Sequence, residues 1–289
     1  MDLIKLIKAK RPNLKDNSLR SYLTTLRILN DNKAIENLNF IINEFKLPTQ
    51  RNKLTSLLVV LTAFNKAEFD EAEEFYRKEL ENRNKEYNSY IATHSKSDKQ
   101  EKNWVQLDEL KKIMNQYKKD AIANPTKKTV QKYLISALYL LQPPKRLVYS
   151  DMKVIDSRKE NDGTTNYLLN LGRNKKYFIL NTYKTIDKHG KKEILIPKDI
   201  NSIINMWLKV NTTENFLLNS KGVGMTSNGL GKYIKMLFKS TGKQITVNLL
   251  RNIFVSENVD LDVLKKNKEI ADAMNHSTGT QGSVYLKEN

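Results

Sequence analysis

The sequence predicts a mainly α-helical protein with a small antiparallel β-sheet, an α+β fold in two parts. Apolar residues recur at spacings of three and four over much of the chain, as on one face of an α-helix. Short apolar runs flank a turn sequence further on, as in a β-hairpin. The polar stretch 91–103 has no periodicity and is predicted to be a linker between a helical domain, 1–90, and a larger domain, 104–289.

The first domain is predicted to contain three helices. Residues 17–29 place their leucines and a tyrosine on one face, and Asp16 or Asn17 can cap the start of this helix. A second helix is expected after Pro48, where leucines again fall in helical register. A third, from about 68 to 87, is richer in charged residues than in apolar ones, which is typical of a solvated helix face.

The second domain is predicted to begin with two helices, the second of which ends before Pro143 and Pro144. Runs of strand-forming residues follow, and DKHG at 187–190 predicts a hairpin turn. The chain then becomes helical again. The expected helices are at about 107–117, 127–141, 204–210, 229–238 and 247–257, and the expected strands are at 166–171, 176–183 and 191–197.

The composition fits a folded protein that binds a polyanion. The 289 residues are 39% hydrophobic, which is enough for a packed core. The net charge is +18, from 50 Lys and Arg against 32 Asp and Glu. Such an excess of positive charge destabilises the folded chain through self-repulsion, which a bound polyanion offsets. Nucleic acid is therefore the first candidate partner and an anionic membrane surface the second. A solvated Lys-rich surface without a partner is the remaining alternative.

Several chemistries are excluded or disfavoured. Without Cys there is no disulfide, no thiolate catalysis and no Cys-bound zinc. The three His are far apart in the sequence and form no metal-binding motif, so we expect no metal and no cofactor. No phosphate-binding loop of the ATP-binding type is present. The glycine-containing stretch SKGVGMTSNG is interpreted as a turn before a helix that Thr226 or Ser227 caps.

The sequence also predicts an intracellular protein, in the cytoplasm, nucleus or a viral replication site. The first residues lack the features of a secretory signal peptide. No apolar run approaches the roughly 18 residues that a membrane span requires. We therefore expect a protein that is neither secreted nor inserted in a membrane.

Five residues stand out as candidates for chemistry. Arg146 follows two prolines that fix the backbone, although an ordinary surface arginine fits as well. Lys184 lies in the expected hairpin, where a lysine is usually only solvated. Arg251 lies within an apolar helical segment, which is costly unless the arginine is paired or faces an anion. Near the end of the chain, His276 precedes Tyr285 by nine positions.

In this order, the residues resemble the pattern of the tyrosine recombinase, or phage-type integrase, family. The stretch PPKRLVYSDMKV resembles the segment that bears the family's first Arg, and TYKT with GKKEILIP resembles the hairpin that bears its Lys. ITVNLLRNIFVSE resembles the HxxR helix, and MNHSTGTQGSVY the GHSxxxxTxxY ending. The prolines before Arg146 and the Lys/Asn-rich composition resemble most the recombinases of large DNA viruses and their satellite viruses.

The resemblance implies a helical core-binding domain and a catalytic domain that clamp double-stranded DNA. Tyr285 would attack a phosphodiester and form a 3′-phosphotyrosine, without metal or ATP. Arg146, Arg251 and His276 would stabilise the transition state, and Lys184 would protonate the leaving 5′ oxygen. The implied enzyme is a site-specific DNA recombinase, acting in viral genome integration. It would work as a homotetramer on two duplexes and be a monomer or weak oligomer without DNA.

The sequence departs from the family pattern at two positions. Asn248 replaces the His of HxxR, and it can donate a hydrogen bond but cannot shuttle a proton near neutral pH. Asn275 replaces the Gly before the later His. Three alternatives stay open: a type IB-like topoisomerase, a catalytically inactive DNA-binding relative, and a metal-dependent nuclease or transposase.

Other basic residues are expected to bind DNA phosphates, mostly without reading sequence. Only four residues follow Tyr285 in this sequence, and we expect Tyr285 to lie on a mobile segment when DNA is absent. The predicted phosphate-binding residues are Arg20, Arg51 and Lys53 in the first domain and Lys232, Lys235 and Lys239 in the second.

Overall fold

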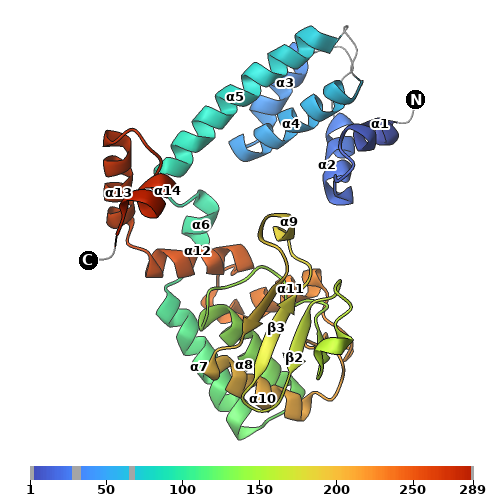
Figure 1. Ribbon diagram of the computed structural model, residues 1–289, viewed down its shortest axis with the longest axis vertical. Coiled ribbons are helices and arrows are strands. Elements are labelled where there is room, and N and C mark those ends of the chain that lie inside the picture. Colours follow the sequence, from blue (N-terminus) through green and yellow to red (C-terminus); the bar gives the residue numbers. More distant parts are fainter. Residues whose placement is uncertain (1–2, 28–33, 65–68, 288–289) are drawn as a thin grey trace. The chain divides into compact units, whose positions relative to one another are not determined.

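The computed structural model describes residues 3–27, 34–64 and 69–287 (Figure 1). The chain divides into two compact units, Met1–Lys96 and Ser97–Asn289, here called the N-terminal and C-terminal units. The fold is mostly helical with one small four-stranded sheet, which is the predicted class. Within the described residues, no helix has both the length and the apolar character needed to cross a membrane.

The helix α4 is the centre of the N-terminal unit and contacts the other four helices described there. One apolar face packs against α3 and α5, and the other packs against α1 and α2, so that two separate hydrophobic clusters form. A helix that is apolar on two faces is stable only when other helices cover both. The helices are α1 (Leu3–Lys10), α2 (Asp16–Leu26), α3 (Ala34–Glu44), α4 (Leu47–Phe64) and α5 (Asp70–Ala92).

The three helices predicted in this unit are confirmed as α2, α4 and α5, with shifted ends. The predicted capping of α2 is wrong, because Asp16 already lies in the helix and Lys15 occupies the N-cap position without a side-chain cap. Leu29 and Glu68, predicted ends of two of these helices, lie outside the described residues. The helices α1 and α3 were not predicted. In α1, lysines interrupt the apolar pattern, although Ile7 is fully buried.

The stretch 91–103, predicted to be a linker, is partly helical. The helix α5 continues to Ala92, and α6 (Asp98–Asn103) follows after a short break. Ser97 forms a capping box with Gln100: its hydroxyl accepts a hydrogen bond from the backbone N–H of Gln100, and its own N–H donates to the Gln100 side chain. Capping of this kind stabilises a short polar helix that has no apolar periodicity to reveal it.

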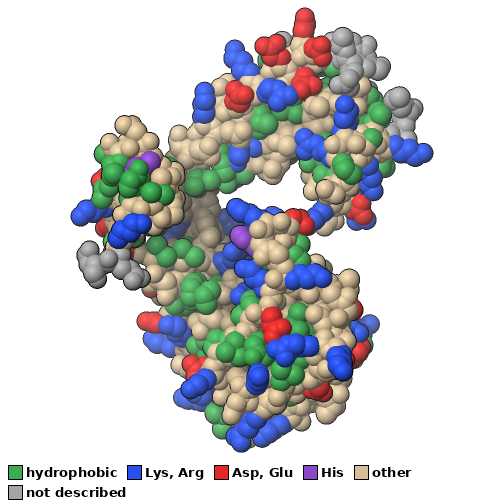
Figure 2. Space-filling view, in the orientation of Figure 1, with side chains coloured by type: hydrophobic (Ala, Val, Ile, Leu, Met, Phe, Trp, Pro, Cys, Tyr) green, Lys and Arg blue, Asp and Glu red, His purple; other side chains and the backbone are tan. Residues whose placement is uncertain are grey.

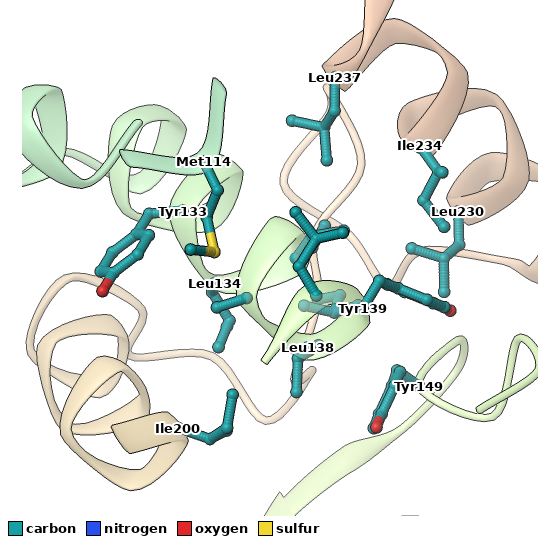
Figure 3. Packing of buried hydrophobic residues seen from close by; sticks show 14 of the residues in the cluster. Met114, Tyr133, Leu134, Leu138, Tyr139, Tyr149, Ile200, Leu230, Ile234 and Leu237 are labelled. Carbon is teal, nitrogen blue, oxygen red and sulfur yellow. The ribbon is translucent and has the colours of Figure 1, made fainter. Parts of the chain in front are cut away.

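The helix α8 is the centre of the C-terminal unit. Its last eight residues, Tyr133–Leu140, are all buried, and α7, α10, α11 and α12 each contact it (Figure 3). Thr126 caps its start through a reciprocal pair of hydrogen bonds with Thr129. The helices are α7 (Leu107–Ala123), α8 (Lys127–Leu140), α10 (Lys198–Val210), α11 (Ser227–Leu237) and α12 (Val247–Asn258). All five were predicted, and Thr226 caps α11 as expected.

The sheet has the strand order β1-β2-β3-β4 and is mixed, not purely antiparallel. The predicted hairpin is confirmed, because β2 and β3, and β3 and β4, pair antiparallel. The unpredicted strand β1 pairs parallel with β2. A three-residue strand is too short to show an alternating pattern, which explains why it was missed. The strands are β1 (Lys153–Ile155), β2 (Tyr167–Asn170), β3 (Lys176–Leu180) and β4 (Lys192–Leu195), and a short 3-10 helix, η2 (Arg158–Glu160), follows β1.

The chain ends in a weakly packed helical segment after α12, here called the C-terminal arm, residues 260–285. Of the residues in its main helix, α13 (Leu261–Ala273), only Ala271 is buried. Val263, Leu264 and Ile270 are exposed, so the helix does not bury its apolar side chains. The arm continues through the short helix α14 (Thr278–Thr280) into a π-helical turn, η4 (Gln281–Tyr285). The helix α13 was not predicted, and the mobility of Tyr285 stays a prediction.

Candidate active site

The segment that carries Arg146 is anchored to the core at that residue and at Tyr149, three positions later. The Tyr139 hydroxyl donates a hydrogen bond of 3.1 Å to the backbone carbonyl of Arg146. Tyr149 is fully buried, and its ring packs edge-on against Tyr139 and Phe178 at centroid distances of 5.8 and 5.2 Å (Figure 3). The Arg146 side chain itself is exposed. The backbone is therefore held in place while the guanidinium stays accessible.

The two buried tyrosines of this segment are poor candidates for a nucleophile. Burial raises the pKa of Tyr139 well above its usual range, and the nearby Tyr149 contributes a smaller rise. Burial likewise raises the pKa of Tyr149, against a lowering by its hydrogen bond with Gln142. Both phenols therefore stay neutral, and neither reaches solvent.

Arg251 is presented by α12 on the side opposite the core. Thr246 caps this helix by accepting a hydrogen bond from the Leu249 N–H. Leu249, Leu250 and Ile253 are buried, whereas Asn248 is exposed and Arg251 is half-buried. Residues three apart lie on one helix face, so Asn248 and Arg251 point the same way. The apolar residues next to Arg251 in the sequence therefore lie on the opposite face of α12, which packs against the core.

Arg146, Asn248 and Arg251 line one cavity of about 530 Å³. Its other lining residues are neutral: Pro143, Pro144, Asn252, Phe254 and Val255. Within the part of the chain that the structure describes, neither guanidinium forms a hydrogen bond or an ion pair. Two arginines without a counter-ion in a cavity free of carboxylates fit an anion, and the planar donor fork of each matches the oxygens of a phosphate.

Lys184 lies in the connection between β3 and β4 and does not line this cavity. Its side chain is exposed and has no hydrogen-bond or ion-pair partner among the described residues. The predicted tight turn at 187–190 is wrong: the connection contains the short helix α9 (Ile186–His189), which ends at Gly190 with a φ of +66°. Figure 2 shows Lys and Arg side chains around α9, and the connection itself carries Lys184, Lys188 and Lys191 against Asp187.

His276 is held at the end of α13 by backbone hydrogen bonds. Asn275 has a φ of +55°, and the His276 and Asn275 N–H groups donate to the carbonyls of Ala271 and Asp272. This is the Schellman pattern of a helix end, in which the left-handed position favours Gly and tolerates Asn. Asn275 can therefore occupy this position in place of Gly, because asparagine tolerates the left-handed conformation.

The His276 and Tyr285 rings stack on each other, with centroids 5.0 Å apart and planes inclined by 20°. His276 Nδ1 lies 3.1 Å from the Ser277 carbonyl, and its buried Nε2 has no hydrogen-bond partner. Tyr285 is 57% exposed. Neither residue lines the cavity of Arg146 and Arg251. The structure thus brings the predicted catalytic residues together in two groups, with Lys184 apart from both.

The predicted DNA-binding residues fall into two classes. Arg51 donates to Asn84 over 2.6 Å and lies 4.0 Å from the centre of the Tyr87 ring, so it joins α4 to α5. The ammonium of Lys53 lies over the ring of Phe45, and burial lowers its pKa. The other four side chains are exposed and form no hydrogen bond or ion pair with described residues: Arg20, Lys232, Lys235 and Lys239.

Two residues near the site were missed from the sequence. Lys145 is half-buried beside Arg146, and burial, followed by the charge of Lys192, lowers its pKa. Its position directly after two prolines could have indicated Lys145 from the sequence. Asn166 is buried at the start of β2 and forms a hydrogen-bonded junction that no local pattern indicates. In the described residues, no group of three or more His, Asp or Glu side chains is placed to hold a metal ion.

Comparisons with known proteins add little to this geometry. No protein-family model and no curated protein matches the sequence. The structure is similar to one described as the crystal structure of XerA recombinase, with 12% identity over 99% of this chain and 93% of that chain. The TM-score is 0.36. A likeness at this level assigns neither a family nor a role to any residue, so the functional interpretation rests on the residues and their arrangement.

Proposed function

We propose that this protein cuts and rejoins DNA by tyrosine recombinase chemistry. The observation that carries the proposal is a cavity that Arg146 and Arg251, 105 positions apart in the sequence, both line. Neither guanidinium has a hydrogen-bond or ion-pair partner among the described residues, and no carboxylate is among the lining residues. The order of Arg, Lys, Arg, His and Tyr along the chain supplies the remaining groups of the reaction.

In the proposed reaction, the cavity binds the phosphodiester that is cut. Arg146 and Arg251 donate to its non-bridging oxygens, where negative charge grows in the transition state. Asn248, on the same helix face as Arg251, donates a further hydrogen bond through its amide. Because an amide does not titrate near neutral pH, Asn248 contributes binding and no proton transfer.

Tyr285 then attacks phosphorus as the phenolate, after its proton has passed to solvent. The new bond joins the Tyr285 oxygen to phosphorus, and the bond from phosphorus to the 5′ oxygen breaks. Lys184 gives its proton to that oxygen, which leaves as a hydroxyl. His276 donates a third hydrogen bond to the phosphate. Attack of a 5′ hydroxyl on the phosphotyrosine reverses these steps and rejoins the strand, so no external energy source is needed.

The proposal requires the C-terminal arm to change position on DNA, because His276 and Tyr285 lie outside the cavity. The exposed apolar side chains of α13 and its single buried residue support such a movement. The arm would bring Tyr285 to the cavity of its own chain or to that of a neighbouring chain. A tetramer on two duplexes, and a role in integrating viral DNA, stay predictions.

The proposed contacts to DNA phosphates outside the cavity are the exposed residues Arg20, Lys232, Lys235 and Lys239. With the net charge of +18, they favour binding that weakens with salt. Arg51 and Lys53 are weaker candidates for this role, because each already contacts an aromatic ring of its own unit.

A nicked duplex that loses its short 5′ fragment on cleavage tests the proposal, because the protein then stays covalently attached. The expected result is an adduct that survives denaturation, forms in the presence of EDTA and disappears in Tyr285→Phe without loss of DNA binding. Tyr90→Phe is the matched control, since Tyr90 is also an exposed tyrosine.

Other results would point to the alternatives. An adduct that persists in Tyr285→Phe contradicts the assigned nucleophile. DNA binding without any adduct favours the inactive relative, for which Asn248 is the sequence hint. Cleavage that EDTA abolishes favours a metal-dependent nuclease. Relaxation of supercoiled DNA without strand exchange between two duplexes favours the topoisomerase.

A further inference from the structure

Asn166 uses both ends of its side-chain amide at the entrance to β2. Its Oδ1 accepts hydrogen bonds of 2.9 Å from the backbone N–H groups of Asn181 and Thr182. Its Nδ2 donates to the carbonyls of Val148, over 3.1 Å, and Thr182, over 2.9 Å. Only 6% of the residue is exposed. All four hydrogen bonds that a side-chain amide can form are therefore made inside the protein.

These partners belong to two segments that the proposed reaction needs. Val148 lies two positions after Arg146, and Thr182 lies two positions before Lys184. The backbone of Asn166 adds a third connection, because its carbonyl accepts from the Lys153 N–H of β1. One side chain thus joins the Arg146 segment to the base of the Lys184 loop, and the main chain ties both to the sheet.

The geometry of this junction depends on an amide. A carboxylate of the same size accepts but does not donate, so it would face the Val148 and Thr182 carbonyls without hydrogens to offer. Removal of the side chain would leave two backbone N–H groups and two backbone carbonyls without this partner, which destabilises the junction. Because buried amides lie in surroundings of low dielectric, their hydrogen bonds hold the partners in one arrangement.

The two segments are not equally dependent on Asn166. The Arg146 segment has further anchors, in the Tyr139 hydroxyl and the packing of the Tyr149 ring. On the other side, the Asn181 amide also donates to Asn161 and to the Thr165 carbonyl, both over 2.6 Å. Among the described residues, however, both backbone groups of Thr182 bond only to Asn166, and the exposed Lys184 follows two positions later. Loss of Asn166 should therefore displace the Lys184 side of the junction more than the Arg146 side.

We infer that Asn166 is a positioning residue that sets the place of Lys184 relative to Arg146. This inference rests on the proposed function, in which Arg146 binds the phosphate and Lys184 protonates the leaving oxygen. In this proposal, Asn166 contacts neither the phosphate nor the leaving oxygen. It would act by fixing how far the proton donor stands from the phosphate, and a misplacement of about 1 Å can lower a rate by roughly 100-fold.

The test compares two nicked duplexes, one with the ordinary 5′ oxygen at the cut phosphodiester and one with sulfur in its place. A thiolate is a far better leaving group than an alkoxide, since a cysteine thiol ionises at a pKa of about 8.5. The sulfur substrate therefore needs no proton from Lys184. Single-turnover formation of the covalent adduct is measured for the full-length chain and for the variant Asn166→Ala.

The matched control is Asn211→Ala. Asn211 is also buried, at 2% exposure, and its amide forms hydrogen bonds with Asn215 and Thr213 within one loop of the same unit. It joins neither the Arg146 segment nor the Lys184 loop through these bonds. Should Asn166→Ala fail to fold, Asn166→Asp, which keeps the volume and the acceptor, is measured by the same criteria.

The expected result is a loss of about 100-fold on the oxygen substrate and of less than about tenfold on the sulfur substrate for Asn166→Ala. The control should lose less than about tenfold on both. Equal losses of the variant on the two substrates, or a loss no larger than that of the control, would overturn the inference.

Failure of the proposed function gives a different result. In that case the unaltered chain forms no adduct with either substrate. The junction is then judged by amide hydrogen exchange at Asn181 and Thr182, which does not require activity. Faster exchange there in Asn166→Ala than in the control supports the positioning of this loop by Asn166, whereas unchanged exchange contradicts it.

Discussion

Arg146 and Arg251 are the residues on which the functional interpretation depends most. Each is held by a rigid backbone, one beside buried tyrosines and the other on a capped helix. Their guanidinium groups share a cavity whose lining residues include no carboxylate. Two like charges in one cavity, without a counter-ion among the described residues, lower stability, and binding of an anion there would offset this effect.

Arg251→Ala is expected to slow formation of the covalent adduct by about 100- to 1,000-fold, because the variant lacks a donor to the growing negative charge. Arg251→Lys should restore only part of the rate, since an ammonium cannot form the two parallel hydrogen bonds of a guanidinium. Single-turnover cleavage of the nicked duplex measures both. Arg173→Ala, at an exposed arginine between β2 and β3 that is not among the proposed DNA contacts, is the control. Equal rates for Arg251→Ala and the control would contradict the role of Arg251.

At the scale of the element, two helix ends in the C-terminal arm fix the position of His276. The end of α13 places His276 by a Schellman motif, and the side chain of Ser277 then caps α14 by accepting from the Thr280 N–H. His276 therefore lies between two defined helix ends, and Tyr285 stacks on it from the following π-helical turn. The two residues are arranged as a pair before any contact with DNA.

Asn275→Ala should destabilise this helix end by about 1 kcal/mol, because alanine lacks the tolerance of asparagine for the left-handed conformation. Asn275→Gly should keep the motif, since glycine adopts a positive φ without steric cost. Amide hydrogen exchange at Asn275 and His276 measures the local opening. We expect roughly fivefold faster exchange in the alanine variant. Similar exchange rates in the alanine and glycine variants would show that the positive φ of Asn275 does not determine the stability of this helix end.

At the scale of the whole molecule, the hydrophobic clusters do not cross the boundary between the two units. Two clusters lie entirely within residues 3–80, and the other two lie within residues 104–253. Each unit therefore has a core of its own, which is the property that permits a domain to fold alone. The basic surface is likewise carried by both units.

A fragment of residues 97–289 is accordingly expected to fold by itself. Its urea unfolding, followed by circular dichroism, should be a single cooperative transition with nearly the midpoint of the same unit in the full chain. A fragment of residues 1–96 is the companion measurement. A fragment 97–289 without a cooperative transition would show that its core needs the N-terminal unit.

DNA binding should weaken steeply with salt, and the exposed lysines of α11 and of the following 3-10 helix, η3 (Lys239–Thr241), should account for part of that dependence. Replacing Lys232, Lys235 and Lys239 by Ala is expected to reduce the slope of log K against log salt by up to about 0.9 for each phosphate that the variant no longer neutralises. The control removes the same charge from exposed lysines of α7: Lys112, Lys118 and Lys119. Equal slopes for the two triple variants would contradict a specific role of Lys232, Lys235 and Lys239.

The sequence by itself determined the helices whose apolar residues keep a regular spacing, such as α7, α8 and α12, and the hairpin of β3 and β4. It also singled out Arg146, Arg251, His276 and Tyr285, because their types and order are visible along the chain. These features are local, since periodicity, capping and turn chemistry act over a few residues. The helices α1 and α13 were missed because lysines interrupt the apolar spacing of α1 and the apolar face of α13 is left exposed. The helix α3 keeps a helical spacing at Ile35, Leu38, Ile41 and Ile42 and could have been predicted.

Only the tertiary structure decided which of these residues meet. The parallel pairing of β1 with β2, the cavity that joins Arg146 to Arg251, and the four hydrogen bonds of Asn166 all depend on where distant segments return to one another. The position of Tyr285 outside that cavity could likewise not be predicted from the sequence. Long-range pairing follows from packing of the whole core, in which each contact depends on all the others, and a local pattern does not contain that information.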